Sequence, residues 1–438
     1  MSRPSRFPRL YKVTVPERRA IIGDSTGIGA DAVAEALDGG GLDAETADKF
    51  VENVLGTYAL PYGVVPNVRV NGRDHTVPVV IEEPSVVAAA SNAAKMVRAG
   101  GGFFADADPP LMIAQVQLRN VRDAEGAARR ILAQAEEIVR LANRSLEGLV
   151  ARGGGARRVE ARVLAADVVV AHVLVDCRDA MGANLVNGVA EAVSDRVAQI
   201  AAAGMPDACS VGLRILSNLC DNRCVRVRCR VPVDQLATER MSGSDIADGI
   251  ANASRFAELD AYRAATHNKG IMNGIDAVVL ATGNDWRAVE AGAHAFAARS
   301  GRYLPLAVWR HDGDAVVGQL EMPLALGIVG GTLRVHPAAR LSLRLLGVTS
   351  AQELACVVGA VGLASNLAAV RALASDGIQR GHMGLHARTV ALAAGAAGEQ
   401  VEAVAAMIVE ARDITLEGAR RALAAVAAEA GGHGEPTR

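Results

Sequence analysis

The sequence contains little lysine and few aromatic residues. Of its 46 basic residues only 4 are Lys, and the other 42 are Arg. Aromatic residues make up 3% of the chain although 50% of it is hydrophobic, so Ala, Val and Leu supply most of the apolar surface. Such small side chains favour closely packed helices. Each remaining lysine is informative, because Arg cannot replace a compact ammonium group or an amine whose pKa must shift.

Neither sign of charge is in clear excess, since the formal net charge is −2 at pH 7. Proteins that bind nucleic acid without sequence preference need a basic face, so we expect no nucleic-acid partner. The basic N-terminal segment lacks the apolar core of a secretory signal. The longest apolar runs that we identify, residues 87–90 and 168–175, are too short for a membrane span. We therefore expect no membrane contact and a cytoplasmic location.

The six cysteines form no C-x-x-C pair, and their number fits a reducing cytosol. Cys220, Cys224 and Cys229 are close enough in sequence to be considered as metal ligands. No paired Cys or His at zinc-finger spacing follows them, so we interpret them as small apolar residues of a strand. We expect no metal.

The chain has 438 residues, which is enough for two or three domains. Its segment 111–219 alternates strand and helix patterns in the order β-α-β-β-α-β, which predicts a ferredoxin-like domain. Residues 1–110 and 220–376 would form a larger domain around it, and the Ala-rich residues 377–438 a helical flap. The predicted fold class is α+β, with a large mainly helical mixed domain, an inserted small domain and a C-terminal flap.

Within the large domain, apolar residues at three- and four-residue spacing predict helices over 30–37 and 44–55. The Asn71-Gly72 turn predicts a hairpin over residues 65–80. Pro84 then opens a predicted helix over residues 85–98.

Gly23, Gly27 and Gly29 have the G-x-x-x-G-x-G spacing of short-chain dehydrogenases. Glycine patterns alone are weak evidence, only a short apolar run precedes this one, and no Tyr in the chain has a Lys four residues later. We interpret the segment as a loop before a helix and keep the dehydrogenase as an alternative.

Lys269 is the most informative of the four lysines. Its neighbours are polar residues and glycines: His267, Asn268, Gly270, Asn273 and Gly274. We interpret this density of polar groups beside glycines as a functional loop at a helix start. The alternative is a solvated helix start without a function.

Two acidic positions are candidates for catalysis. Asp285 follows an apolar run and a Thr-Gly-Asn turn, so it is either a site carboxylate or a helix N-cap. Glu82 and Glu83 precede an apolar helix and could simply interact with its dipole. In a cleft, burial and like charge would instead keep one of them protonated as a proton donor.

Two further segments have the features of a binding site and of a mobile acid. Residues 179–184, D-A-M-G-A-N, connect a strand to a helix; Gly182 permits close backbone approach, and a helix N-terminus favours phosphate. His382 lies near Gly377 and Gly381, which could act as hinges. A lone His is usually structural, but one on a mobile segment is a candidate gated acid.

Together these segments resemble hydroxymethylglutaryl-CoA reductase, specifically its soluble second class. E-N-V-L-G at 52–56 is similar to that family's E-N-V-I-G, and D-A-M-G-A-N at 179–184 matches its D-x-M-G-x-N signature. G-I-V-G-G-T at 327–332 and G-H-M at 381–383 match two further signatures. The likeness runs in order from about residue 5 to 425.

The resemblance implies an enzyme that interconverts mevalonate plus CoA and 3-hydroxy-3-methylglutaryl-CoA by two hydride transfers. It implies four catalytic residues, Glu83, Lys269, Asp285 and His382. Ser85, Arg263 and Asn273 would bind the hydroxymethylglutaryl part. Asp179, Met181, Gly182 and Asn184 would bind the dinucleotide. The large domain would bind substrate and CoA and form a homodimer with active sites between subunits, and the flap would close and bring His382.

The cofactor is expected to be NAD(H), because the resemblance is greatest to degradative members of the class. In those enzymes an acid shortly after the L-A-N-R segment contacts the ribose 2′-hydroxyl. Here the matching position is Leu146, with Glu147 beside it, whereas Arg144 could accept a 2′-phosphate. The alternatives are an NADPH-dependent enzyme that makes mevalonate and a non-catalytic protein that binds CoA or a nucleotide.

Overall fold

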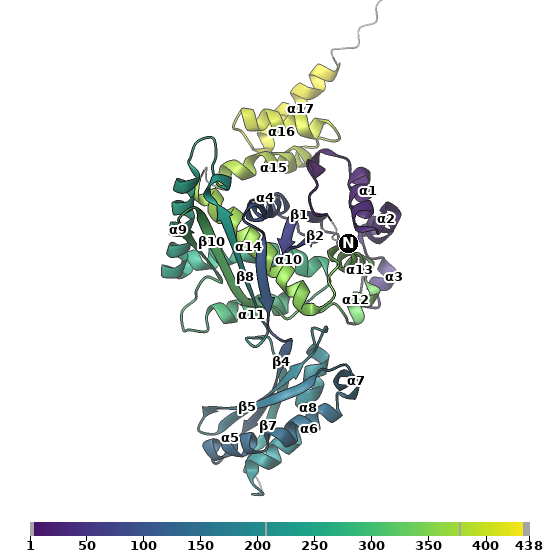
Figure 1. Cartoon of the computed structure of the whole chain (residues 1–438). Helices are drawn as coiled ribbons and strands as arrows, with labels where there is room; N and C mark the ends of the chain where they lie inside the picture. Colours follow the sequence, from purple (N-terminus) through teal and green to yellow (C-terminus); the bar gives the residue numbers. More distant parts are fainter. Residues whose placement is uncertain (1–3, 206–207, 376–377, 432–438) are drawn as a thin grey trace, which may run out of the picture.

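The computed structural model describes residues 4–205, 208–375 and 378–431, without the side chains of 332, 378–385 and 429–431. Figure 1 shows three bodies: a large domain in the middle, a small domain at one end and a group of helices at the other. The α+β fold class, with its large mixed domain, inserted small domain and C-terminal helices, is confirmed. The predicted domain boundaries and the roles given to the domains stay predictions.

The large domain contains a six-stranded sheet in the order β2-β1-β3-β8-β10-β9. Its strands are β1 (Tyr62–Val70), β2 (Arg73–Val80), β3 (Phe103–Ala107), β8 (Cys224–Pro232), β9 (Ala307–Asp312) and β10 (Ala315–Pro323). The helices of this part are α1 (Val15–Thr26), α2 (Ala30–Leu37), α3 (Ala44–Ala47), α4 (Val86–Ala99), α9 (Gly243–Leu259), α10 (Ala261–Ala281), α11 (Trp286–Ala297), α12 (Gly331–Val335), α13 (Pro337–Leu346) and α14 (Ala351–Ala374). Neighbouring strands are antiparallel except for β1 and β3.

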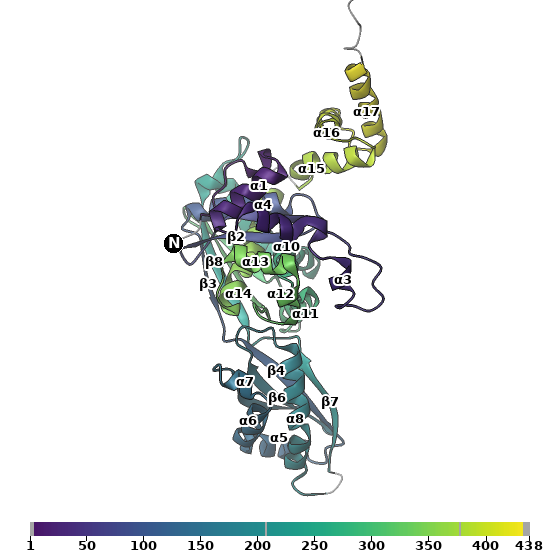
Figure 2. The ribbon, with the colours of Figure 1, turned by 90° about the vertical axis from the view of Figure 1, so that its right-hand side faces the viewer.

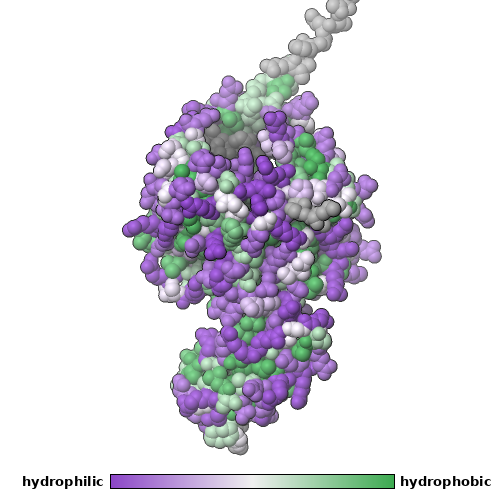
Figure 3. All heavy atoms as spheres, viewed as in Figure 1, coloured by the Kyte–Doolittle hydropathy of each residue, from purple (hydrophilic) through white to green (hydrophobic). Residues whose placement is uncertain are grey.

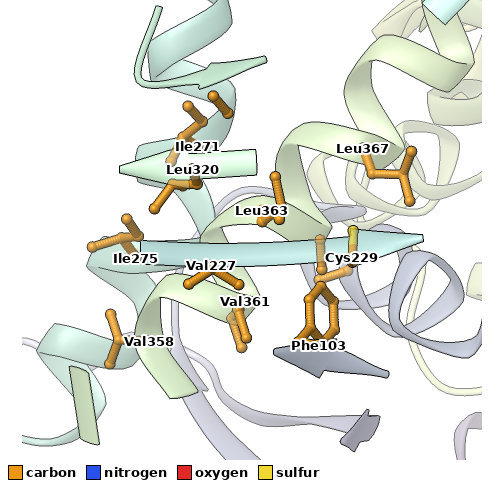
Figure 4. Packing of buried hydrophobic residues seen from close by; sticks show 14 of the residues in the cluster. Phe103, Val227, Cys229, Ile271, Ile275, Leu320, Val358, Val361, Leu363 and Leu367 are labelled. Carbon is orange, nitrogen blue, oxygen red and sulfur yellow. The ribbon is translucent and has the colours of Figure 1, made fainter. Parts of the chain in front are cut away.

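Helix α14 forms the centre of the large-domain core. It packs against α10, α4 and α9 and against strands β3 and β8, and Figure 4 shows Val358, Val361 and Leu363 among the buried side chains around β8. Close approach depends on small residues: a Cβ at Gly362 would lie 2.7 Å from Cγ1 of Ile275. Adding a methyl group there would therefore force α10 and α14 apart.

The expectation that no apolar stretch approaches a membrane span overlooked α14. Residues 354–370 are 17 uncharged residues in a row. Within the described part of the chain, one helix, α14, has the length and the apolar composition needed to cross a membrane. However, 83% of its most apolar window is buried inside the protein, as in the core helix of a large domain.

The small domain has the predicted β-α-β-β-α-β order. Its four strands pair antiparallel in the order β5-β6-β4-β7, the ferredoxin-like arrangement. Its elements are β4 (Leu111–Arg119), α5 (Ala124–Ala133), α6 (Ala135–Arg144), α7 (Glu147–Val150), β5 (Gly155–Ala165), β6 (Val168–Asp176), α8 (Ala183–Ala202) and β7 (Ser210–Ser217). Its helices and sheet enclose a hydrophobic core that is separate from that of the large domain.

The C-terminal helices are α15 (Ile378–Ala393), α16 (Gln400–Glu410) and α17 (Leu416–Gly431). They bury a small core of their own, which includes Ala387, Ala391, Val404, Ile408 and Ala419. Figures 1 and 2 both place this unit at the end of the large domain that lies away from the small domain.

Two local predictions for the N-terminal region had different outcomes. The hairpin is confirmed, with Asn71 and Gly72 at φ 49° and 81° in the turn between β1 and β2. The helix predicted over 44–55 was wrong beyond Ala47. Val51 and Leu55 there are 61% and 105% exposed, so no packing holds this segment helical.

The glycine segment is a loop before a helix only over residues 27–29, which precede α2, whereas residues 23–26 end α1. Gly23 lies inside α1, Gly27 ends that helix in the left-handed conformation, and Gly29 caps α2. A Cβ at Gly23 would lie 2.6 Å from the backbone of Gly29, so the glycines allow a tight connection between two helices. A helix, rather than the strand of a dinucleotide-binding motif, precedes them, which removes the basis of the short-chain dehydrogenase alternative.

Candidate active site

The structure brings two of the predicted catalytic residues into contact. Lys269 donates a hydrogen bond from Nζ to Oε2 of Glu83 at 2.7 Å, across 186 positions of sequence. The Lys and Glu side chains are 60% and 36% exposed, so small molecules can reach the pair. Glu83 lies in the connection from β2 to α4, and Lys269 lies on α10. An ion pair this exposed adds little to stability, so the fold does not depend on it.

Lys269 lies in the middle of α10 and not in a loop at a helix start, as predicted. The helix begins well before it, where the side chain of Asp260 accepts a hydrogen bond from the backbone N–H of Arg263 at 2.8 Å. The glycines of this segment were misleading because Gly274 serves packing. A Cβ there would lie 2.7 Å from the carbonyl oxygen of Val361 in α14.

Two polar neighbours of Lys269, His267 and Asn268, serve the fold and not the site. His267 and Asn268 are 1% and 0% exposed. His267 Nε2 lies 3.0 Å from the carbonyl oxygen of Ala307, and Asn268 donates to the carbonyl of Leu304 at 3.0 Å. Burial lowers the pKa of His267 to about 4, so its ring is neutral near pH 7. On this part of α10, Lys269 is exposed while these two neighbours face the core.

Ser85, a predicted substrate-binding residue, has an unsatisfied hydroxyl two residues after Glu83. It occupies the N-cap position of α4 at φ 78° and ψ −21°, a left-handed conformation that is strained for a side chain other than glycine. Its Oγ is buried without a hydrogen-bond partner among the described atoms. Leaving such a group unpaired costs about 1–3 kcal/mol, and an oxygen of a bound substrate could satisfy it.

The other two predicted substrate-binding residues lie on α10. Asn273 follows Lys269 by one helical turn, so the two share a face of the helix. Arg263 lies in the first turn, and burial lowers the pKa of its guanidinium group. Its position is about a third of a turn around the axis from that of Lys269. The structure thus groups Asn273 with the Glu83–Lys269 pair and leaves Arg263 on a neighbouring face.

Asp285 is the N-cap of α11, one of the two interpretations that the sequence left open. Its Oδ1 accepts hydrogen bonds from the backbone N–H groups of Arg287 and Ala288 at 3.1 and 3.2 Å. The same oxygen lies 3.5 Å from the guanidinium group of Arg287. The carboxylate is 40% exposed, so it stays available to solvent. The ion pair of Lys269 in this structure is with Glu83, and Asp285 is paired with Arg287.

The predicted dinucleotide loop leads from β6 into the N-terminus of α8. Gly182 is the N-cap at φ 104°, and a Cβ there would lie 2.4 Å from Sγ of Cys177, so only glycine fits. No side chain caps this end of the 20-residue helix, and Asn184 is exposed in its first turn. Free N–H groups at the positive end of a long helix dipole fit the phosphates of a dinucleotide.

Asp179 fixes this loop to the large domain. Its Oδ1 accepts a hydrogen bond from the backbone N–H of Ala351, at the start of α14, at 2.9 Å. Its carbonyl oxygen accepts one from the N–H of Ile328, also at 2.9 Å. A Cβ at Gly327 would lie 2.6 Å from the backbone nitrogen of Met181. The two glycine-containing signatures are therefore packed against each other, one from each domain.

Arg223 organises this contact and was missed in the sequence. It is 5% exposed, and its guanidinium group donates to the carbonyl oxygens of Ala180, Met181 and Leu326. Burial lowers the pKa of this group, while the neighbouring acidic and thiol groups oppose the shift. One arginine among 42 carries no sequence signal for such a role.

Asn284 is a second missed residue, directly before Asp285. Its side chain accepts a hydrogen bond from the N–H of Gly327 at 2.8 Å and donates to the carbonyl of Gly327 at 3.1 Å. This amide therefore joins the turn that carries Asp285 to the segment that packs on the predicted dinucleotide loop. The Thr-Gly-Asn turn was noticed in the sequence, but its partner lies 43 positions away.

The residues that could distinguish the two dinucleotides lie at the α6–α7 corner. Leu146, at the position predicted to meet the ribose 2′ group, is 5% exposed and belongs to the small-domain core. Glu147 and Arg144 are both exposed beside it. An acid and a base are thus both available to a ribose 2′ group.

His382 lies on α15, but its side chain is outside the described part of the structure. The helix belongs to the C-terminal unit, which Figures 1 and 2 place away from the small domain. The prediction that the His382 imidazole joins Glu83 and Lys269 therefore stays a prediction.

The cysteine interpretation is confirmed for two positions of the cluster. Cys224 and Cys229 lie in β8 and are buried, and Cys220 is buried just before that strand. Burial raises the pKa of the Cys220 thiol to about 11 and that of Cys229 to about 12. These cysteines are therefore protonated core residues near pH 7.

A pair of carboxyl groups lies between α10 and α11. Asp276 contacts Glu290, and Glu290 also pairs with Nε2 of His294 at 2.7 Å. His294 Nδ1 lies 2.7 Å from the hydroxyl of Tyr303. Burial, together with Glu290, raises the pKa of Asp276 to about 8, and its Oδ1 has no partner among the described atoms.

A surface hollow of about 720 Å³ lies on the sheet and not at these residues. Arg226, Arg228, Glu321 and Phe296 contribute to its lining. None of the predicted site residues does. Hydrophilic residues dominate the face of the large domain in Figure 3, with hydrophobic ones scattered among them.

Comparison with known proteins gives one family. The model of hydroxymethylglutaryl-coenzyme A reductase matches residues 14–387. A protein of Archaeoglobus fulgidus named 3-hydroxy-3-methylglutaryl-coenzyme A reductase is 44% identical over 423 residues, which are 96% of this chain and 94% of that protein. A probable 3-hydroxy-3-methylglutaryl-coenzyme A reductase of Borreliella burgdorferi is 36% identical over 78% of this chain and 77% of its own length.

Solved structures of 3-hydroxy-3-methylglutaryl-coenzyme A reductase from Streptococcus pneumoniae are similar in fold to most of this chain. One matches with a TM-score of 0.80 and 40% identity, over 84% of this chain and 100% of that chain. A second, of the class II enzyme bound to NADPH in open conformations, has the same TM-score, identity and coverage.

Proposed function

The chain belongs to the hydroxymethylglutaryl-coenzyme A reductase family and is an oxidoreductase, and we propose that it oxidises mevalonate in the presence of CoA to 3-hydroxy-3-methylglutaryl-CoA with NAD⁺. The proposed parts are the direction of the reaction, oxidation of mevalonate, and the choice of NAD⁺ as the dinucleotide. Both rest on the resemblance of its motifs to soluble, degradative members of the family. The non-catalytic alternative would require the loss of a catalytic position, and Glu83, Lys269, Asp285 and His382 are all present.

The contact between Glu83 and Lys269 is the observation that carries the proposed chemistry, in either direction and with either dinucleotide. The ammonium group of Lys269 would stabilise the negative charge that develops on the substrate oxygen. One preorganised donor of this kind contributes roughly 3–4 kcal/mol in other enzymes. Glu83, at hydrogen-bond distance from that ammonium group, would exchange a proton with the same oxygen. The unpaired hydroxyl of Ser85 and the amide of Asn273 would bind the carboxylate and hydroxyl groups of the substrate.

Asp285 would keep Lys269 protonated and couple it to Glu83. In this structure its Oδ1 caps α11 and lies 3.5 Å from the guanidinium group of Arg287, so its contact with Lys269 is part of the proposal. Asn284 bonds the turn that carries Asp285 to Gly327.

The loop before α8 would hold the dinucleotide, which supplies the hydride chemistry when bound. The free N–H groups of α8 would bind its phosphates, with Gly182 giving access and Asn184 available as a polar contact. Asp179 and Met181 would set the loop's position, since both pack against the second glycine-rich segment.

His382 would transfer a proton to or from the CoA sulfur. A thiolate is a better nucleophile than a thiol, so a base is needed when CoA enters, and an acid is needed when it leaves. We propose that the C-terminal unit closes over the site and brings His382, in a homodimer with active sites between subunits. Val51, Leu55 and Tyr58, in and beside the E-N-V-L-G segment, are 61%, 105% and 90% exposed, and this group of exposed apolar side chains supports a contact with a second copy. The six free thiols support a cytoplasmic location.

A second candidate, an NADP(H)-dependent enzyme, is favoured by the exposed Arg144 and by the NADPH-bound relative. The experiment that separates the two compares kcat/KM for NADH and NADPH in the reduction of 3-hydroxy-3-methylglutaryl-CoA. We expect NADH to be preferred by about tenfold or more, as one charged contact to the 2′ position implies. A preference for NADPH would overturn the NAD(H) proposal and favour the biosynthetic direction.

A further inference from the structure

The junction between the two domains is held by a charged side chain that has no carboxylate partner. Arg223 is 5% exposed, yet among the described residues no Asp or Glu lies within 4 Å of its guanidinium group. It donates instead to backbone oxygens: to Met181 at 3.1 Å, to Ala180 at 3.3 Å from both Nη atoms, and to Leu326. A buried arginine is costly unless its donors are paired, so this set of bonds must be kept.

The three acceptors belong to two different parts of the protein. Ala180 and Met181 lie in the loop that leads into α8, whereas Leu326 lies in the segment that follows β10. Arg223 itself lies where the chain returns from the small to the large domain, and its carbonyl oxygen accepts from Leu324 at 3.1 Å. One side chain therefore ties the loop before α8 to the segment after β10.

The segment after β10 is in turn bonded to the turn that carries Asp285. Gly327, the next residue after Leu326, is bonded through both its N–H and its carbonyl to the side chain of Asn284. Asn284 in turn precedes Asp285. A continuous series of short contacts thus runs from the loop before α8, through Arg223 and Leu326, to the turn that carries Asp285.

We propose that Arg223 is a positioning residue, which sets the dinucleotide loop against the catalytic residues of the large domain. This inference rests on the proposed function of that loop. Arg223 does not touch the ligand; it fixes the carbonyl groups of Ala180 and Met181, and with them the entry to α8. Without it these carbonyls lose their donors, and the N–H groups of α8 no longer face a fixed point relative to Glu83 and Lys269.

The test uses the full-length chain and two substitutions. Arg223→Met removes every donor, whereas Arg223→Lys keeps the charge and three donors on a shorter reach. The matched control is Arg130→Met, because Arg130 also donates to a backbone carbonyl, that of Ala201, on the far side of the small domain. Dinucleotide Kd is measured by fluorescence titration with NADH and with NADPH, beside KM for 3-hydroxy-3-methylglutaryl-CoA and the thermal midpoint.

The expected result is a split between the two ligands. Arg223→Met should raise the dinucleotide Kd by about tenfold, and Arg223→Lys by about threefold, as partial loss of the hydrogen bonds implies. KM for 3-hydroxy-3-methylglutaryl-CoA should change by less than about twofold. Arg130→Met should leave both constants unchanged. If Arg223→Met does not fold, the Lys variant carries the same test.

Two outcomes would overturn the inference: an unchanged dinucleotide Kd in the folded Arg223 variants, or an equal rise for dinucleotide and 3-hydroxy-3-methylglutaryl-CoA together with a lower thermal midpoint. The second pattern would make Arg223 a general stabiliser. Failure of the proposed function is distinguishable, because binding is measured without turnover. A wild-type chain that binds dinucleotide but reduces no substrate would contradict the reaction and still allow the Arg223 comparison. A wild-type chain that binds neither dinucleotide would overturn both proposals.

Discussion

The loop before α8 is bonded to the large domain at many points, whereas the helix that carries His382 packs mainly within its own C-terminal unit. Arg223, Asp179 and Gly327 hold the loop through side-chain and backbone contacts. The C-terminal helices instead bury a separate core. This difference agrees with the proposed function, in which the loop before α8 and Lys269 are placed in advance and movement of the C-terminal unit would bring His382 to the CoA sulfur.

The largest effect is expected at Lys269, in the fixed part of the site. Lys269→Met should lower kcat by about 10²–10³, because the developing oxyanion loses its preorganised donor. It should do so equally for 3-hydroxy-3-methylglutaryl-CoA and for free mevaldehyde, since both reductions pass through an oxyanion. Steady-state kinetics with both substrates checks this.

Lys95→Met is the matched control, since Lys95 is exposed on α4 away from the pair. A loss confined to one of the two substrates in Lys269→Met would show that Lys269 does not serve both steps.

A smaller effect is expected at Gly182. Gly182→Ala should weaken dinucleotide binding by about tenfold, because alanine is strained at φ 104° and its Cβ would collide with Sγ of Cys177. The control is Gly204→Ala, at φ 77° with nothing within 4 Å, which carries the strain without the collision. Equal dinucleotide affinities in the two variants would contradict the close-packed loop.

The smallest effect concerns the pH dependence of stability. Burial and the neighbouring Glu290 raise the pKa of Asp276 to about 8, above its ordinary value of 3.8. Because the pKa of Asp276 is raised in the folded state, its protonated carboxyl group contributes to the free energy of unfolding. This contribution is complete below the ordinary pKa of 3.8 and is lost as the pH rises through about 8. Asp276→Asn should therefore raise the thermal midpoint by about 2–4 °C at alkaline pH and by less at acidic pH.

Thermal melts of this variant over a pH series, beside those of Asp195→Asn at an exposed position of α8, check the sign. A gain that is largest in acid would contradict the assignment of the proton to Asp276.

The fold could be predicted where neighbouring residues in the sequence determine the local structure. The strand and helix order of the small domain follows from the periodicity of its apolar residues, and the hairpin follows from Asn71-Gly72. Prediction failed where tertiary contacts decide. Residues 48–55 have a helical pattern of apolar residues but no surface to pack against. Gly23 and Gly274 permit close contacts of helices, although glycines in a sequence usually indicate loops.

The candidate site divides in the same way. Glu83 and Lys269 could be proposed from residue type and resemblance, although their contact joins positions 186 apart. Arg223 and Asn284 could not, because what sets them apart is a bond to Leu326 or Gly327 that only the folded chain creates. His267 shows the opposite error, since a polar side chain that looked functional in sequence is buried against Ala307.

The most direct test of the division between a fixed and a moving part is the behaviour of His382→Gln in two assays. The account predicts that the variant reduces free mevaldehyde at a rate within about twofold of wild type, while the full reduction of 3-hydroxy-3-methylglutaryl-CoA falls by about 10² or more. His386→Gln, one helical turn further along α15 and exposed, should leave both rates unchanged. An equal loss in both assays for His382→Gln would contradict the account.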